Sequence, residues 1–445
     1  MDPLEGTMPE RYSSTSVYSK LQRIAELARR MPDAALTTLA HHIDIDWLYE
    51  AHRRTRKDGA TGVDGQTAAE YGENLEGNLQ SLLDRAKSGT YRAPPVRRVH
   101  IPKGDGKRTR PIGIPTFEDK ILQRAVVMAL EAIFEQDFVD WSYGFRPGRS
   151  QHQALEATRS QLMEMHGGWL IEIDVQSFFD EIDHGHLRTI VGQRVRDGVI
   201  TRLIGKWLKA GVMEGGERRR AKAGSPQGGV ISPMLANIFL HEVFDRWLER
   251  EVKPRIKGEV FAVRFADDII IVVQDEDQVR RVMQVLPKRF GKYGLRLHPD
   301  KTRVVDMRRP RKRGGRSEKG RTFDLLGLTH YWGLSRRGNW AIKRKTAKDR
   351  LRRAIGSIWK WCRGNRHRPV AEQQAVLASK LRGHYNYYGV RTNRGSLSKF
   401  YWAVQHAWQH WLNRRGDSRA MPWERFYRLM RRHPLPRPRI VQVTR

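Results

Sequence analysis

The chain has 445 residues, long enough for roughly two to four domains, and 39% of its residues are hydrophobic, enough to build buried cores. It carries 83 Lys and Arg residues against 49 Asp and Glu residues, which gives a formal net charge of +34. A protein with this excess repels itself unless a polyanion neutralises it, and nucleic-acid phosphates are the usual polyanion. The composition therefore favours a nucleic-acid partner over a membrane surface.

Other features of the sequence exclude several classes of protein. The longest purely aliphatic stretch, Ile269–Val273, is far shorter than the ~20 residues that span a bilayer. The first ten residues are acidic and polar, so we expect neither a secretory signal nor a transit peptide. The single cysteine, Cys362, excludes an internal disulfide and a multi-cysteine zinc site. We therefore expect a cytoplasmic protein with no membrane partner.

In chain order, the first part of the sequence predicts helices followed by an extended hairpin. Residues 1–50 have the apolar spacing of amphipathic helices, and Gly59–Gly65 is a break rich in turn-forming residues. Residues 75–83 are expected to form a short helix, and residues 91–115 an extended segment with a turn at its centre. Residues 119–134 have one continuous apolar face and predict a long helix.

The rest of the sequence predicts a middle region of mixed helices and strands and a helical C-terminal region. Residues 169–175 and 261–273 have the composition and alternation of strands. Residues 308–321 contain eight Lys or Arg residues and one acid, which indicates a solvated loop or an arm facing phosphates. Residues 322–332 return to strand character, and from about residue 343 the pattern is helical.

Three carboxylates stand out in this pattern. Asp267 and Asp268 are adjacent acids between two apolar strand arms, and Asp174 ends another apolar strand. A bare Asp-Asp pair is more often simple turn chemistry, but here buried strands flank it on both sides, where unpaired acids are costly. If the two segments are neighbours in one sheet, the three carboxylates converge. Hard oxygen ligands of this kind suit Mg²⁺ and two-metal phosphoryl transfer.

The carboxylates lie in segments that resemble, in order, the sequence blocks of reverse transcriptases. Gly62–Gly65 (GVDG) resembles the N-terminal block of group II intron and related enzymes. The seven blocks that follow are Ile101–Lys103 with Arg110–Pro115 (RPIGIP; first), Tyr143–Ser150 (YGFRPGRS; second), Asp174–His184 (DVQSFFDEIDH; third), Gly224–Pro233 (GSPQGGVISP) with Leu235–Asn237 (fourth), Phe265–Asp268 (FADD) after Arg264 (fifth), Gly294–Lys301 (GLRLHPDK; sixth) and Leu326–Gly327 (seventh). Beyond them, Leu381–Gly389 (LRGHYNYYG) resembles the maturase (thumb, or X) segment of group II intron proteins. The block Phe265–Asp268 begins with phenylalanine, where reverse transcriptases more often have tyrosine, so it lacks one hydroxyl donor.

The resemblance implies how the catalytic centre works. Asp174, Asp267 and Asp268 would be catalytic and, together with Val175, would hold two Mg²⁺ ions, for which Mn²⁺ can substitute.

Further residues are expected to bind the incoming nucleotide. Lys103 and Arg110 would clamp its triphosphate, one as a point charge and the other as a bidentate fork. Gln227 would lie under the nucleotide, and Phe179 would stack beneath the sugar and exclude a 2′-hydroxyl.

Contacts with nucleic acid are expected from the second block, the sixth block and the maturase segment. The residues are Arg146, Arg149, Lys301, Arg382, His384, Tyr385 and Tyr387. In the same region Trp359, Trp408 and Trp411 recur at helical spacing and are interpreted as core, so the basic residues between them would face outward towards RNA. Since Tyr385, Tyr387 and Tyr388 cannot all point inward, some are expected to contact RNA.

The implied fold is α+β, a right-hand polymerase with fingers and an antiparallel-sheet palm, followed by an all-helical thumb or maturase domain. The expected divisions are an N-terminal helical extension with the N-terminal reverse transcriptase block (Gly62–Gly65) at 1–75, fingers at 76–165, palm at 166–335 and thumb at 336–445. A fingers segment near 190–225 would interrupt the palm.

The implied function is that of a group II intron-encoded reverse transcriptase and maturase. Its partners would be its intron RNA, an RNA template with a DNA primer, and dNTPs; the oligomeric state is left open. We expect no DNA endonuclease activity, because the chain stops soon after the maturase segment and one cysteine cannot build the zinc cluster of an HNH domain. One alternative is a related enzyme without an intron that serves DNA repair or phage defence. A second is an RNA-binding splicing cofactor without polymerase activity.

Overall fold

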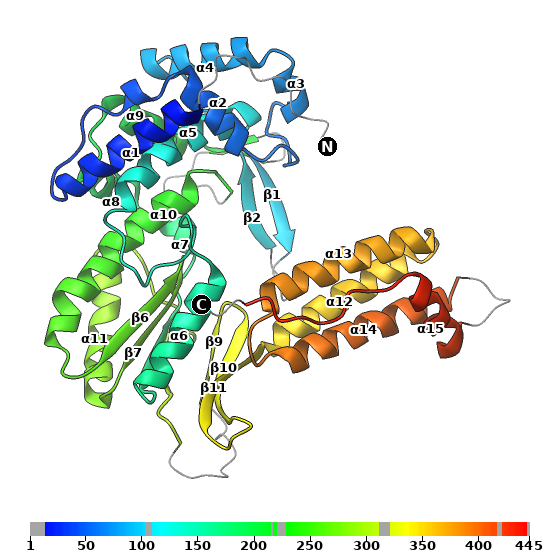
Figure 1. Cartoon of the computed structure of the whole chain (residues 1–445). Helices are drawn as coiled ribbons and strands as arrows, with labels where there is room; N and C mark the ends of the chain where they lie inside the picture. Colours follow the sequence, from blue (N-terminus) through cyan, green and yellow to red (C-terminus); the bar gives the residue numbers. More distant parts are fainter. Residues whose placement is uncertain are drawn as a thin grey trace. The chain divides into compact units, whose positions relative to one another are not determined.

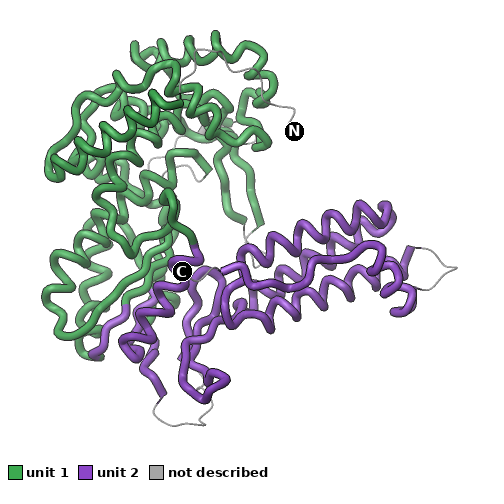
Figure 2. The backbone as a smooth tube through the Cα atoms, in the orientation of Figure 1, with its two compact units in different colours: residues 1–150, 173–271, 276–303 green, residues 151–172, 272–275, 304–445 purple. Residues whose placement is uncertain are grey.

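The computed structural model describes residues 14–102, 109–214, 217–219, 228–310, 321–415 and 421–442. Helices and strands are mixed along the chain, which confirms the predicted α+β class (Figure 1). The described residues form two compact units (Figure 2). Unit 1 comprises residues 1–150, 173–271 and 276–303, and unit 2 comprises residues 151–172, 272–275 and 304–445. The division into fingers, palm and thumb made from the sequence remains a prediction.

Unit 1 contains most of the helices of the first 300 residues. They are α1 (Ser14–Arg30), α2 (Ile45–Arg54), α3 (Ala68–Gly72), α4 (Leu75–Ser88), α5 (Phe117–Phe134), α7 (Phe178–Glu181), α8 (His184–Gly192), α9 (Gly198–Lys209), α10 (Ser232–Leu240) and α11 (Glu276–Gly291), with the short helical turns η1 (Ala40–His42), η2 (His241–Asp245), η3 (Leu248–Val252) and η4 (Lys253–Arg255). The helices predicted near residues 1–50, 75–83 and 119–134 are confirmed within the described residues.

Helix α5 forms the centre of the helical part of unit 1. It begins after Thr116, whose hydroxyl accepts a hydrogen bond from the backbone N–H of Asp119 at 3.2 Å and so caps the first turn. Its residues are buried on nearly all sides rather than on one face, because α1 and α2 both pack against it. The broad burial includes Val127 and Met128, which lie outside the predicted apolar face.

A four-stranded sheet in unit 1 carries the predicted extended hairpin. Its strand order is β2 (Thr109–Ile114), β1 (Val96–Pro102), β4 (Val212–Glu214) and β5 (Glu217–Arg219). Strands β1 and β2 are antiparallel, with Ile101 opposite Arg110, as the hairpin prediction requires. The turn between them lies outside the described residues, and so does Lys103.

A second four-stranded sheet holds the strands that end at the acidic residues. Its order is β6 (Val260–Phe265), β7 (Asp268–Val273), β3 (Trp169–Ile173) and β8 (Arg303–Asp306). The expectation that the segments of Asp174 and of Asp267–Asp268 are neighbours in one sheet is therefore confirmed, because β3 is hydrogen-bonded to β7. The strand interiors are apolar and buried, and the acids lie where the strands begin or end.

Unit 2 combines one helix, a three-stranded sheet and a helical bundle. Its elements are α6 (Gln151–Glu164), β9 (Thr322–Leu325), β10 (Leu328–Leu334), β11 (Trp340–Thr346), α12 (Lys348–Asn365), α13 (Val370–Tyr388), α14 (Arg394–Leu412) and α15 (Trp423–Arg432). The strand predicted over residues 322–332 is two strands, because Leu326 and Gly327 both take positive φ and turn the chain. Strand β11 delays the helical region to Lys348, slightly later than expected.

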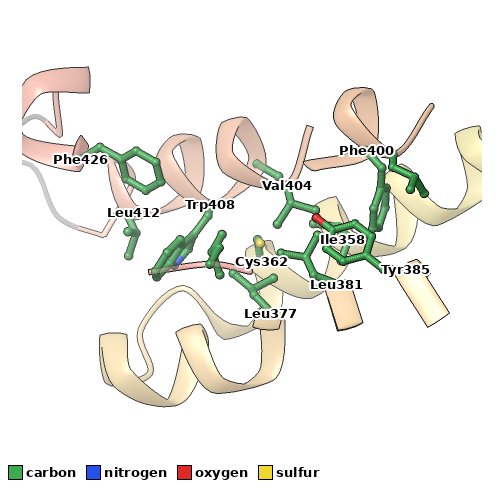
Figure 3. Close-up of a cluster of buried hydrophobic side chains, with 13 residues drawn as sticks. Ile358, Cys362, Leu377, Leu381, Tyr385, Phe400, Val404, Trp408, Leu412 and Phe426 are labelled. Atoms are coloured by element: carbon green, nitrogen blue, oxygen red, sulfur yellow. The ribbon is translucent and has the colours of Figure 1, made fainter. Parts of the chain in front are cut away.

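The helical bundle of unit 2 has a continuous hydrophobic core (Figure 3). Its buried side chains come from the faces predicted at helical spacing, among them Ile358, Cys362, Leu377, Leu381, Leu397, Val404 and Leu412. Trp408 is fully buried and donates its indole N–H to Gln373 Oε1 at 2.9 Å, while Trp359 and Trp411 pack against this core and are partly buried. The interpretation as a core residue is confirmed for Trp408, whereas Trp359 and Trp411 lie at the margin of the core.

Candidate active site

The two adjacent acids lie at a tight turn between β6 and β7. Ala266 takes φ of 57°, a left-handed conformation that costs a non-glycine residue about 1 kcal/mol or more. Gly144 lies against this turn so closely that a Cβ atom there would be 2.2 Å from the backbone nitrogen of Ala266. The sequence block that contains Gly144 therefore supports the turn that carries Asp267 and Asp268.

A buried ion pair supports the same turn from inside unit 1. The guanidinium of Arg264 donates to both carboxylate oxygens of Asp245, at 2.8 and 2.5 Å, and both side chains are fully buried. It also donates to Asn237 Oδ1 at 2.9 Å, and Asn237 Nδ2 donates to the carbonyl of Gly144 at 2.7 Å. The network thus joins the second, fourth and fifth sequence blocks around Ala266, whose carbonyl accepts from Arg264 at 3.4 Å.

The electrostatics of this pair favour the charged state of both partners. Burial by itself would raise the pKa of Asp245, but the positive charge of Arg264 and hydrogen bonds from His241 and Arg264 lower it below the ordinary value. Arg264 and Asn237 lie in blocks that resemble those of reverse transcriptases, but their motifs predicted no role for them, and no motif contains Asp245. Asp245 lies in the π-helical turn η2 and in none of the quoted blocks, so nothing in the sequence marked it.

Asp174 follows β3 and is held by the segment that resembles the sixth block. Its carbonyl accepts the backbone N–H of His298 at 2.8 Å, and its own N–H donates to Thr302 Oγ1 at 3.3 Å. Val175 forms an isolated antiparallel bridge with Leu297. These contacts fix the backbone of Asp174 at the end of its strand.

Lys301 lies directly at the carboxylate of Asp174. Its Nζ is 3.1 Å from Oδ2 and 3.3 Å from Oδ1. The side chain of Asp174 is 38% exposed and that of Lys301 is 59% exposed, so this is a solvent-accessible pair. Lys301 therefore faces one of the predicted metal ligands, while its predicted contact with nucleic acid stays a prediction.

Asp267 is influenced by charges from two other blocks. Burial raises the pKa of its carboxyl, the charge of Arg110 lowers it, and the negative charge of Asp174 raises it further. Arg110 and Asp174 therefore both lie within electrostatic reach of Asp267. The three acids do not, however, form a closed cluster: within the described residues no group of three or more His, Cys, Asp or Glu side chains could hold a metal ion as it stands.

Two predicted nucleotide contacts can be placed and two cannot. Arg110 lies on β2. Phe179 is 9% exposed and packs edge-on against the fully interior Phe178, with ring centroids 5.3 Å apart. Phe178 is core, as predicted, and the sugar-gating role of Phe179 stays a prediction. Lys103 and Gln227 lie outside the described residues.

The segment that follows Gln227 is nevertheless anchored. Gly228 has φ of 111°, and a Cβ there would lie 2.5 Å from Ile112 Cγ2, so the backbone passes directly over β2. The backbone N–H of Ile231 donates to Gln123 Oε1 at 3.2 Å, and Gln123 Nε2 donates to the buried carboxylate of Asp119 at 3.0 Å. Helix α5 thus holds the C-terminal end of the fourth block.

The predicted nucleic-acid contact of Arg146 is wrong. Its side chain is buried and donates to Glu135, at 2.9 Å, and to the carbonyls of Val139 and Ser142. These partners satisfy the guanidinium within the fold and leave it unavailable to phosphates. Arg149 pairs with the exposed carboxylate of Asp140 at 2.9 Å and remains partly exposed, so its predicted contact is still open to test.

Two of the four predictions in the maturase segment are corrected. Tyr385 is fully buried in the core of unit 2 and donates its hydroxyl to the carbonyl of Pro436 at 3.1 Å, so it cannot contact RNA. The ring of His384 stacks on Phe400 with centroids 3.9 Å apart, and burial lowers its pKa to about 4. His384 is therefore neutral near pH 7 and packs rather than binds phosphate.

The other two residues face outward. Tyr387 is 38% exposed, and Arg382 is exposed on α13. On α12, Arg352, Lys360 and Arg363 are also exposed, so the predicted outward basic face of this unit is present. No described helix is long and apolar enough to span a bilayer.

Comparison with known proteins agrees with this geometry. A family profile described as "Reverse transcriptase (RNA-dependent DNA polymerase)" matches residues 101–330. The chain is 37% identical over 329 residues to protein YkfC of Escherichia coli (strain K12), covering 65% of this chain and 84% of that protein. It is 29% identical over 465 residues to group II intron-encoded protein LtrA of Lactococcus lactis subsp. cremoris, and the match covers 87% of this chain and 76% of LtrA. It is also 29% identical over 177 residues to nuclear intron maturase 2, mitochondrial, of Arabidopsis thaliana, and this match covers 31% of this chain and 24% of that protein.

Proposed function

This chain belongs to the reverse transcriptase family and is an RNA-directed DNA polymerase, and from that premise we propose that it also binds a group II intron RNA and assists its splicing. We further propose that it has the right-hand arrangement of fingers, palm and thumb, with the divisions expected from the sequence. The match to an intron-encoded protein over 87% of the chain supports the splicing role, and so does the name of the intron maturase relative.

The residues around the β6–β7 turn support a site for divalent cations. Asp174, Asp267 and Asp268 offer hard carboxylate oxygens, the donors that Mg²⁺ prefers, and burial together with the negative charge of Asp174 raises the pKa of Asp267. Two Mg²⁺ ions, held by these acids and the backbone of Val175, would activate the attacking hydroxyl and neutralise the leaving pyrophosphate. Mn²⁺ would substitute for them.

The chain's own residues would prepare this site. Lys301 compensates the charge of Asp174 and would compete with the cations for its carboxylate oxygens. Arg110, whose charge acts on Asp267, is positioned to meet the triphosphate beside the acids. Lys103 would complete the triphosphate clamp, Gln227 would contact the templating base pair, and Phe179 would exclude a 2′-hydroxyl.

The exposed basic face of unit 2 supports the RNA-binding part of the proposal. Arg352, Lys360 and Arg363 recur along one side of α12, and Arg382 and Tyr387 are exposed on α13. A helical surface of this charge suits phosphate and shape recognition of a folded RNA. We place the protein in the cytoplasm, with a template–primer duplex, dNTPs and its intron RNA as partners.

The observation that supports this catalytic site is that the charges of Arg110 and Asp174 both act on Asp267, beside the turn at Ala266. Primer extension on an RNA template with Mg²⁺ tests it. We expect cDNA from the wild-type protein, none after chelation of Mg²⁺, and none from the Asp267→Ala, Asp268→Ala double variant. The double variant should still bind intron RNA and assist splicing, because its changes leave unit 2 untouched. A wild-type protein that made no cDNA would favour the splicing-cofactor alternative.

A further inference from the structure

An uninterrupted strip of aromatic rings runs across two helices of unit 2. Trp402 and His406 of α14 have ring centroids 3.6 Å apart, and His406 lies 4.5 Å from Trp423 of α15. Trp423 in turn lies 5.7 Å from Tyr427, also on α15. These four residues, here called the aromatic strip, are in ring contact from one end to the other although α14 and α15 are separate elements (Figure 1).

The strip is exposed at both ends and anchored in the middle. Trp402 is 61% exposed and Tyr427 is 55% exposed, the two largest values among the exposed large hydrophobic residues of the described chain. Trp423 also touches the buried ring of Phe426, with centroids 5.6 Å apart, which ties the strip to the core. Contiguous exposed apolar patches mark interaction sites, and ring contact joins these four residues into one such patch.

Positive charge continues the strip at each end. Lys399 precedes Trp402 by one helical turn on α14, and Arg431 follows Tyr427 by one turn on α15, and both are exposed. Residues three or four apart share a helix face, so these cations extend the line of rings. Helix α15 also carries Arg425, Arg428 and Arg432 against one acid, Glu424. The surface therefore combines flat apolar faces with a net positive margin.

We propose that the aromatic strip binds unpaired nucleotides of RNA, with bases stacked on Trp402 and Tyr427 and phosphates near Lys399 and Arg431. Stacking platforms with basic margins are the usual way in which proteins hold single-stranded nucleic acid, because every base has a face that can stack. Paired bases offer no free face, so the strip selects single-stranded segments over duplex. The proposal rests on the RNA-binding function proposed above and adds a site separate from the exposed basic residues of α12.

Charge decides between RNA and a protein as the occupant. An apolar protein surface would gain nothing from Lys399 and Arg431 at the ends, whereas a single strand presents phosphates at the spacing of its bases. The ring of His406, 3.6 Å from that of Trp402 and 4.5 Å from that of Trp423, joins the aromatic residues of the two helices into one stacking surface.

Binding of a short single-stranded oligo(rA) that contains 2-aminopurine tests the proposal on the full-length chain. Stacking quenches 2-aminopurine, so the probe reports ring contact as well as affinity. Trp402→Leu and Tyr427→Leu keep apolar side chains but remove the flat rings, and each should weaken binding roughly tenfold and relieve the quenching. Trp402→Phe keeps a ring and should retain most of both signals.

Two controls separate the strip from other roles. A fully paired RNA duplex of the same length should bind all variants equally, because its bases offer no free face for stacking, and primer extension by the wild-type protein tests the polymerase function separately from the strip. Unchanged oligo(rA) affinity in both leucine variants would overturn the proposal and leave the strip as a protein contact. Equal loss in Trp402→Phe and Trp402→Leu would also overturn it, since stacking requires the ring. Failure of primer extension in the wild-type protein would instead count against the polymerase function.

Discussion

Arg264 and Asp245 form a fully buried, doubly hydrogen-bonded ion pair one residue away from the turn that carries the catalytic acids. The pair lies 19 residues apart in sequence and connects η2 with the end of β6. Because Arg264 also reaches Asn237 and, through it, Gly144, the pair stabilises the backbone on both sides of Ala266. The catalytic turn is thus held by buried charges that take no direct part in the chemistry.

Removal of Arg264 should therefore be severe. Arg264→Gln leaves the buried charge of Asp245 without its arginine partner and is expected to lower the free energy of unfolding by about 3–5 kcal/mol. Thermal or urea unfolding measures this. A matched control is Arg246→Gln, which breaks the half-exposed pair with Glu242 and should cost no more than about 1 kcal/mol. Similar losses in the two variants would contradict the role given to the buried pair.

Gly144→Ala should impair catalysis more than folding. The added Cβ would approach the backbone nitrogen of Ala266 to 2.2 Å, so the turn carrying Asp267 must shift. We expect kcat for cDNA synthesis to fall at least tenfold, while KM for the primer–template changes little. Gly205→Ala on α9 is the control, since nothing lies within 4 Å of its new Cβ, and alanine there should raise helix stability by about 0.5–1 kcal/mol. An active Gly144→Ala variant would show that the turn tolerates displacement.

Lys301→Gln should lower the Mg²⁺ concentration needed for activity. Lys301 occupies both carboxylate oxygens of Asp174, so its removal eliminates a competitor for that ligand. Titration of primer extension with Mg²⁺ measures the shift, which we expect to be a few-fold because the pair is solvent-exposed. The control is Lys292→Gln, which changes an exposed lysine just before Gly294 and should leave the titration unchanged. A higher Mg²⁺ requirement in Lys301→Gln would mean that Lys301 assists the cations instead of competing with them.

Acid should destabilise unit 2 through His330. Burial and the charge of Arg344 lower the pKa of this ring to about 3, against 6.5 in the unfolded chain. Between these two pKa values His330 is protonated in the unfolded chain and neutral in the folded chain. The free energy of unfolding therefore falls as pH is lowered from about 6.5 towards 3. The contribution should reach about 2 kcal/mol at pH 5.

Urea unfolding of the wild-type and His330→Phe proteins at pH 8 and pH 5 checks this expectation. The phenylalanine keeps a ring to stack on Phe323, whose centroid lies 4.6 Å from that of His330, but it cannot be protonated. The variant should lose less stability than the wild-type protein between the two pH values. If the wild-type and His330→Phe proteins lost the same free energy of unfolding between pH 8 and pH 5, the acid sensitivity would come from other buried groups.

Local patterns in the sequence were sufficient to predict most helices and strands and to identify the three acidic residues as candidates for the catalytic site. Alternating apolar residues predicted the strands that end at Asp174 and Asp267, and the periodic stripes predicted the buried faces of α12 to α14. These features depend on neighbours within a few residues, which a sequence displays directly. The polymerase activity was predicted from the resemblance of the ordered blocks to those of reverse transcriptases, because several short motifs rarely occur in the same order by chance.

What each polar side chain does was decided only by the tertiary structure. Arg146 and Arg149 look alike in the sequence, yet one is buried against Glu135 and the other remains partly exposed. Tyr385 and Tyr387 are two residues apart on one helix, and their directions into the core and towards solvent follow from packing. By itself the sequence determined the chain's elements, its polymerase family and its basic character. The structure decided which charges are satisfied internally, because a partner 11, 19 or 27 residues away leaves no trace in local composition.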